Sequence, residues 1–82
     1  MQENNFVIAK AHLLELLYFR LKNTPVSTTE HQEILKVIQI VKEYSYVNRL
    51  QQKGRLARII VDSINLDYEL GDLIIQFDQR IS

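Results

Sequence analysis

The residue types best suited to metal binding or proton transfer stand one helical turn apart near the start of the chain, at His12 and Glu15. Helical bundles that hold metals with carboxylates use the opposite order, Glu before His, and supply it from two helices with further Glu residues. The only other histidine is His31. We therefore expect no metal site and no cofactor, and we interpret His12 as a surface residue beside Glu15.

Asp67 is a second candidate for chemistry, because on a continuous helix it would lie near the centre of the apolar face. A buried carboxylate without a partner is costly, so it must cap a helix, pair with a cation or be exposed. The simplest interpretation is an N-cap at a break in the helix. Pairing with Lys10 or Lys42 is the alternative, and a catalytic acid is the weakest, since no second catalytic group accompanies it.

A cluster of basic residues surrounds Gly54 and consists of Arg49, Lys53, Arg55 and Arg58. Residues 36–58 contain six basic residues and one acidic residue, whereas residues 59–82 contain one basic residue and five acidic residues. The formal net charge of zero therefore conceals a strong segregation along the chain. The cluster could bind phosphates or an acidic protein surface, or it could be a solvated turn that follows the C-terminal end of a helix.

Apolar side chains appear on more than one side of the first predicted helix, residues 5–22. Phe6, Leu13 and Leu17 mark its main apolar face, while Ile8 and Phe19 lie on a second line that also carries His12 and Glu15. Leu16 falls between the two. A helix that is apolar on two sides is either enclosed by its own fold or docked on a partner. We take the following as candidate partner-binding residues: Ile8, His12, Leu16 and Phe19.

The composition of the chain indicates that helices position the candidate residues described above. The chain has 82 residues, 46% of them hydrophobic, with only two Gly, one Pro, no Cys and no Trp. So few turn-forming residues argue against a β-rich domain, and the absence of Cys excludes a disulfide scaffold. We predict one all-α domain with helices over residues 5–22, 28–52 and 55–81.

Helix-capping and helix-breaking residues indicate where these helices start, kink and stop. Ser27-Thr28-Thr29-Glu30 fits a capping box, and Gly54 suits a left-handed helix end. The apolar pattern of the second helix fails at residues 44–48, so this helix either kinks there or packs its second half against a different part of the structure. The third helix has a possible break at Asn65–Asp67. The result is a small antiparallel helical bundle of three main helices, or four if the third helix breaks. In the three-helix form, which we prefer, the second and third helices make a long hairpin about Gly54. In the four-helix form, breaks near residues 46 and 66 fold the chain into a compact bundle.

No motif of a known catalytic site is present, so we expect a non-enzymatic protein that binds another protein, including a second copy of itself. Small bacterial adaptors, immunity proteins and antitoxins fill such roles. The alternative is a small nucleic-acid-binding regulator that uses the cluster around Gly54. The longest unbroken apolar run is four residues, well short of the roughly 20 that span a membrane. We therefore expect a soluble, cytoplasmic protein without membrane partners.

Overall fold

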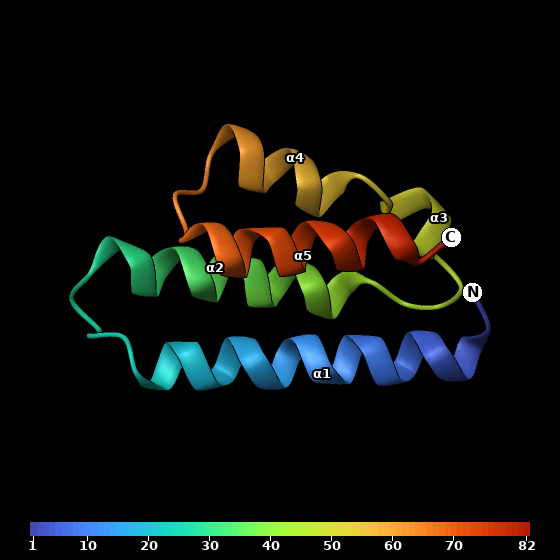
Figure 1. The fold of residues 1–82 in the computed structure, drawn as a ribbon, viewed down its shortest axis with the longest axis horizontal. Coiled ribbons are helices and arrows are strands. Elements are labelled where there is room, and N and C mark those ends of the chain that lie inside the picture. Colours follow the sequence, from blue (N-terminus) through green and yellow to red (C-terminus); the bar gives the residue numbers. More distant parts are fainter.

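The computed structural model describes residues 1–82 and contains helices only, which confirms the predicted all-α bundle. The helices are α1 (Glu3–Lys22), α2 (Thr29–Glu43), α3 (Arg49–Gln52), α4 (Arg55–Asp62) and α5 (Tyr68–Arg80). In Figure 1 α1 forms one edge of the molecule, α2 and α5 cross its middle, and α4 covers the opposite edge. In this view α1 and α4 run in one direction, and α2 and α5 run in the opposite direction.

The first helix begins slightly before its predicted start and ends at the predicted place. Asn23 is its C-cap, and the Asn23 side chain donates from Nδ2 to the carbonyl of Phe19 at 2.8 Å. The Thr24 hydroxyl donates to the carbonyl of Arg20 at 2.6 Å. These contacts satisfy the last carbonyls of α1, and Pro25 prevents the helix from continuing.

The second helix starts with a simpler cap than the predicted box. Thr28 is the N-cap, and its hydroxyl accepts from the backbone N–H of His31 at 3.2 Å. Glu30 does not reach back to the cap; its carboxylate lies 3.6 Å from the guanidinium of Arg20. A hydroxyl cap is therefore present, but it belongs to Thr28 and not to Ser27, the first residue of the predicted box. The third residue after this cap is His31, so Glu30 is not placed to complete the box.

The predicted helix 28–52 is not continuous, because α2 ends at Glu43 and the break lies where the apolar pattern fails. Ser45 and Asn48 exchange two hydrogen bonds: Ser45 N–H donates to Asn48 Oδ1 at 2.8 Å, and Asn48 N–H donates to Ser45 Oγ at 3.2 Å. Asn48 Nδ2 also donates to the carbonyl of Glu43 at 2.9 Å. Short polar side chains compete here with the helical backbone pattern and replace it with a turn.

The predicted helix 55–81 is also divided, so the four-helix form is correct and the long hairpin is wrong. Asp67 caps α5 as predicted, with its carboxylate accepting from Leu70 N–H at 3.2 Å. Its charged partner is Arg20 of α1, not Lys10 or Lys42. Lys10 instead caps the C-terminal end of α2, where its ammonium group donates to the carbonyls of Tyr44 at 2.6 Å and Lys42 at 3.2 Å.

One apolar core joins the helices, and a polar network crosses it. The fully buried residues include Leu17 of α1, Ile34 of α2, Leu56 of α4 and Ile74 of α5. Asp78 of α5 is also fully buried. None of the helices is both long and apolar enough to cross a membrane.

The Asp78 carboxylate replaces a cap that α4 cannot make for itself. The N-cap of α4 is Gly54, which has no side chain and adopts φ +95°. Asp78 Oδ2 accepts from Gly54 N–H at 2.8 Å and from Ala57 N–H at 3.0 Å. The Tyr44 hydroxyl accepts from Leu56 N–H at 3.1 Å and lies 2.6 Å from Asp78 Oδ1. Side chains at the ends of α2 and α5 thus accept from three backbone N–H groups at the start of α4.

Candidate protein-binding surface

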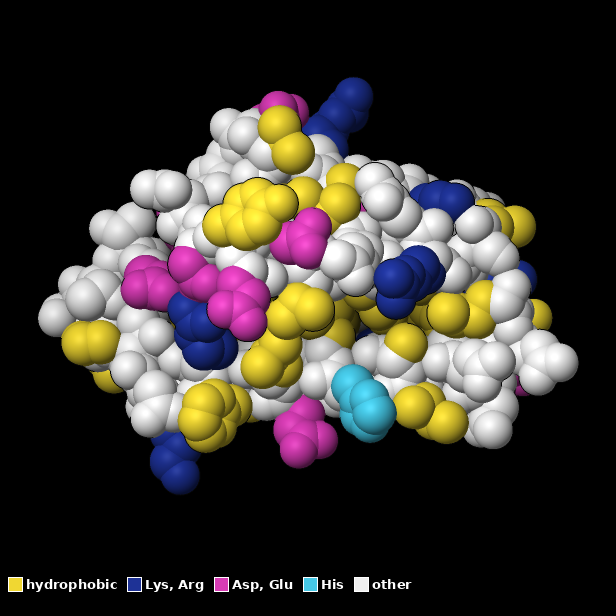
Figure 2. Space-filling view, viewed as in Figure 1, with side chains coloured by type: hydrophobic (Ala, Val, Ile, Leu, Met, Phe, Trp, Pro, Cys, Tyr) yellow, Lys and Arg dark blue, Asp and Glu magenta, His cyan; other side chains and the backbone are white.

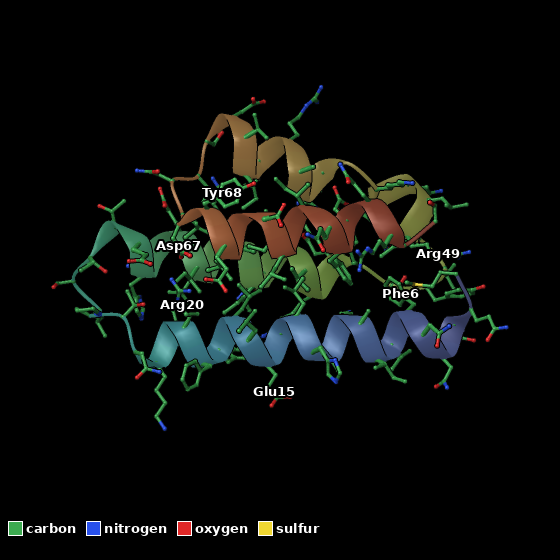
Figure 3. All side chains as sticks on the ribbon, viewed as in Figure 1. Phe6, Glu15, Arg20, Arg49, Asp67 and Tyr68 are labelled. Atoms are coloured by element: carbon green, nitrogen blue, oxygen red, sulfur yellow. The ribbon has the colours of Figure 1, made fainter.

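The side of α1 that faces away from the bundle is unusually apolar. Phe6, Leu13 and Leu17 turn inward and are buried. On the opposite side Val7 and Ile8 are 55% and 47% exposed, and Tyr18 and Phe19 are 44% and 63% exposed. Figure 3 shows Glu15 pointing away from the rest of the molecule, which marks the middle of this side. We call it the outer face of α1 and define it by the following residues: Val7, Ile8, Ala11, His12, Glu15, Tyr18, Phe19 and Lys22.

Three of the four residues predicted to bind a partner lie on this outer face. Ile8, His12 and Phe19 are exposed, whereas Leu16 is half-buried and packs partly against the core. His12, Leu16 and Phe19 also line one shallow hollow together with Glu15. The structure therefore brings the predicted residues together around one continuous strip of helix.

A groove lies beside this strip, between α1 and α5, and has a volume of about 400 Å³. Its residues from α1 include Ala9, His12, Leu13 and Leu16. Its residues from α5 are Leu73, Gln76, Phe77 and Arg80. Figure 2 shows hydrophobic side chains gathered along the boundary between the two helices, with a histidine and basic side chains beside them. We call it the α1–α5 groove.

The contribution of α5 to this groove was missed in the sequence. Asp72, Gln76 and Arg80 follow one another at helical spacing and suggest a solvent face. In the structure Asp72 and Gln76 are half-buried, and Gln76 Nε2 donates to Asp72 at 2.7 Å. One signal in the sequence pointed to this contribution of α5: Leu73 stands one position after Asp72 and outside the apolar stripe of α5, and it is exposed in the structure.

A charged contact joins α1 to the start of α5. Arg20 donates a hydrogen bond to Asp67 at the start of α5, and Figure 3 shows the two side chains pointing toward one another. This hydrogen bond from Arg20 lowers the pKa of the Asp67 carboxyl below its usual value. The same hydrogen bond raises the pKa of the Arg20 guanidinium. Arg20 therefore ties α1 to α5 and is not free for a ligand.

The predicted basic cluster is largely occupied by contacts within the chain. Arg49 donates from Nε to the carbonyl of Ile81 at 2.9 Å, and its guanidinium lies 3.8 Å from the ring centroid of Tyr46. Arg55 pairs with Glu43 at 3.1 Å. Lys53, Arg55 and Arg58 do line a polar hollow with Gly54, but Arg49 lies outside it. The arrangement serves the junction of α2, α3 and α5 more than it forms an anion site.

The buried Tyr44 and the helix-capping Asp67 are both engaged in contacts within the chain. No set of three or more His, Asp or Glu side chains lies close enough to hold a metal ion. The Tyr44 hydroxyl is buried, and burial together with the hydrogen bond to Asp78 raises its pKa far above the usual value, so it stays protonated. Asp67 serves as a helix cap and ion-pair partner. No protein-family model, curated protein or solved structure matches this chain, so its function has to be inferred from its own surface.

Proposed function

We propose that this chain is a non-enzymatic module that binds another protein through the outer face of α1 and the adjoining α1–α5 groove. The observation that carries the proposal is the set of four large apolar side chains exposed on one helix: Val7, Ile8, Tyr18 and Phe19. No other helix exposes more than two such residues. Large apolar side chains that gather on one exposed face are typical of interaction sites.

Burial of these side chains supplies the driving force for binding. Fully covering an exposed Ile or Phe contributes about 1.5–3 kcal/mol. About half or more of each of the side chains of Ile8 and Phe19 is exposed, and Leu73 in the groove is also exposed. A partner that covers all three side chains therefore gains a few kcal/mol of binding free energy. The polar residues His12, Glu15 and Lys22 interrupt the surface and give it a charge pattern that a partner must match.

The mode of recognition that fits is helix-face packing. A straight helix with a shallow groove alongside accepts another helix, whose side chains at i, i+3 and i+4 can enter between α1 and α5. The floor of the groove includes Leu13 and Phe77, which are fixed in the core. The binding surface is therefore rigid and preformed, which reduces the entropic cost of binding.

Comparative affinity capture tests the proposal. Immobilised wild-type chain, an Ile8→Glu/Phe19→Glu double variant and a Val61→Glu control are exposed to lysate of the source organism. Val61 is 74% exposed and lies on α4, at the opposite edge of the molecule from α1 (Figure 1). We expect the same protein to be retained by the wild type and by Val61→Glu and to be lost from the double variant. Equal retention by all three chains would contradict the proposal.

A further inference from the structure

We propose that the partner of the outer face of α1 is a second copy of this chain, whose α1 packs antiparallel on the first about a two-fold axis. The inference rests on the proposed function, names its partner, and places the contact on the outer face of α1 rather than in the α1–α5 groove. It starts from six exposed residues, five on the outer face and Asn4 one turn before it, here called the outer stripe: Asn4, Ile8, Ala11, Glu15, Tyr18 and Lys22.

The spacing of the outer stripe is that of a helix-pairing surface. Its successive members are separated by 4, 3, 4, 3 and 4 positions. This alternation keeps side chains on one side of a helix and matches the a and d positions of a two-stranded coiled coil. Ala11 stands near the middle, where a small side chain allows a close approach of two helices.

The same spacing is self-complementary when the second helix runs in the opposite direction. About an axis level with position 13, Asn4 faces Lys22 of the other copy, Ile8 faces Tyr18, and Ala11 faces Glu15. Val7 lies on the same flank of the stripe as Tyr18, and Phe19 lies on the same flank as Ile8. The two-fold axis therefore brings Val7 beside Tyr18 of the other copy and Phe19 beside its Ile8. Each exposed apolar residue thus meets another apolar residue, and the long Glu15 side chain meets the smallest residue of the stripe.

Charge selects this antiparallel arrangement over the alternatives. In a parallel pair, Glu15 would face Glu15 and Lys22 would face Lys22 across the interface, and like charges in contact are unfavourable. An antiparallel pair centred on position 15 would also bring the two Glu15 carboxylates together. Centred on position 13, Glu15 instead lies beside His12 of the second copy, and Lys22 comes near the end that carries Glu3.

The size of the surface sets the expected affinity. A helix of 20 residues is about 30 Å long and 10–12 Å wide, so its outer side covers roughly 350 Å² in projection. A standard interface buries about 800 Å² on each partner. We therefore expect a weak dimer with a dissociation constant in the micromolar range or above, which forms in a concentration-dependent manner.

Sedimentation equilibrium over a wide concentration range tests the association. We expect wild-type chain to shift from monomer to dimer, Ile8→Glu to weaken the dimer at least tenfold, and Val61→Glu to leave it unchanged. Circular dichroism of each variant confirms that the helices remain. A wild-type chain that stays monomeric at millimolar concentration, or a dimer that withstands Ile8→Glu, overturns the inference.

Disulfide trapping tests the register, because the chain contains no cysteine of its own. Ile8→Cys and Tyr18→Cys chains are mixed under mild oxidation, and the products are separated by mass. We expect the mixed 8–18 disulfide and almost no 8–8 disulfide, because in the antiparallel pair the two copies of position 8 lie about 15 Å apart along the axis, beyond the roughly 7 Å reach of a disulfide. A predominant 8–8 product, or efficient trapping of Ile8→Cys only with Lys22→Cys, contradicts the pairing.

The two failures can be told apart. If the wild type is monomeric but affinity capture still depends on Ile8 and Phe19, the second copy is the wrong partner and the outer face of α1 binds a different protein. If capture is also unaffected by the double variant, both proposals fail. Dimerisation with the 8–18 product supports both.

Discussion

Removing the buried carboxylate of Asp78 should be the most damaging single change to the fold that leaves the apolar core intact. The carboxylate holds two backbone N–H groups of α4, from Gly54 and Ala57, and contacts the Tyr44 hydroxyl. Leaving a buried donor without a partner costs about 1–3 kcal/mol. Gly54 is exposed enough for water to replace part of its hydrogen bond, so we expect Asp78→Ala to lower the free energy of unfolding by about 2–4 kcal/mol.

The Asn variant separates hydrogen bonding from charge. In Asp78→Asn, the side-chain oxygen can still accept from Gly54 and Ala57, and the new Nδ2 group can donate to the Tyr44 oxygen. The Tyr44 hydroxyl then donates to the carbonyl of Gln52, which already lies 2.8 Å away. Only the attraction between a negative charge and the N-terminus of α4 is lost, so we expect a decrease of about 1 kcal/mol.

Urea unfolding followed by circular dichroism gives the measurement, with midpoint and slope fitted for wild type and both variants. A domain of this size has a total stability of about 4–12 kcal/mol, so a loss of 2–4 kcal/mol shifts the midpoint clearly. The slope should stay constant if only stability changes. Equal losses for Asp78→Ala and Asp78→Asn, or a loss below about 1 kcal/mol for Asp78→Ala, would refute the capping role assigned to this carboxylate.

Five further substitutions, at four positions, test other parts of the structure by the same unfolding assay. Asp67→Ala should cost about 1–2 kcal/mol, because it removes the cap of α5 and an exposed ion pair, whereas Asp67→Asn keeps the cap and should cost under about 1 kcal/mol. The pKa of Asp67 is lowered in the folded chain, so its ion pair stabilises the fold above about pH 4 and is lost as the pH falls further. The difference in Tm between wild type and Asp67→Asn should therefore shrink between pH 7 and pH 3. A difference that stays constant over this range would contradict the pairing. Lys10→Met should cost about 1–2 kcal/mol through loss of the contacts to the last carbonyls of α2, and no loss would exclude this capping role. Gly54→Ala should destabilise by about 1–2 kcal/mol because φ is +95°, although the added methyl group meets nothing within 4 Å, so a neutral result would argue against the left-handed turn. Gly71→Ala should stabilise by about 0.5–1 kcal/mol, since this helical position leaves 3.5 Å to the nearest side-chain atom, and a marked loss would show tighter packing there.

The ends of the helices were the most predictable part of the fold, because they depend on local chemistry. Asn23 and Pro25 end α1, Ser45 and Asn48 interrupt the second helix, and Asp67 begins the last one. In each case the side chain bonds to backbone within a few positions, so a short window of sequence contains the whole interaction. This locality explains why the break at Asp67 was predicted while its charged partner was not.

Contacts between distant segments could not be predicted in the same way. Asp78 stands four positions after Ile74 and so falls on the apolar side of α5, which was a visible sign of a buried carboxylate. Its role depends on the capless Gly54 lying beside it, and that requires the packing of α4 on α5. The α1–α5 groove was equally hidden, because periodicity identifies the outward side of each helix but not which two helices share an edge.

The claim that the outer face of α1 is where this chain binds protein can be tested most directly inside cells. A photo-crosslinking amino acid is placed at position 19 on α1 or, as a matched control, at position 61 on α4, both of which are well exposed in the free chain. We predict a discrete cross-linked product from position 19, at twice the mass of the chain if the partner is a second copy, and only uncross-linked chain from position 61. The absence of a product from position 19, or the same product from both positions, would contradict the assignment of this surface.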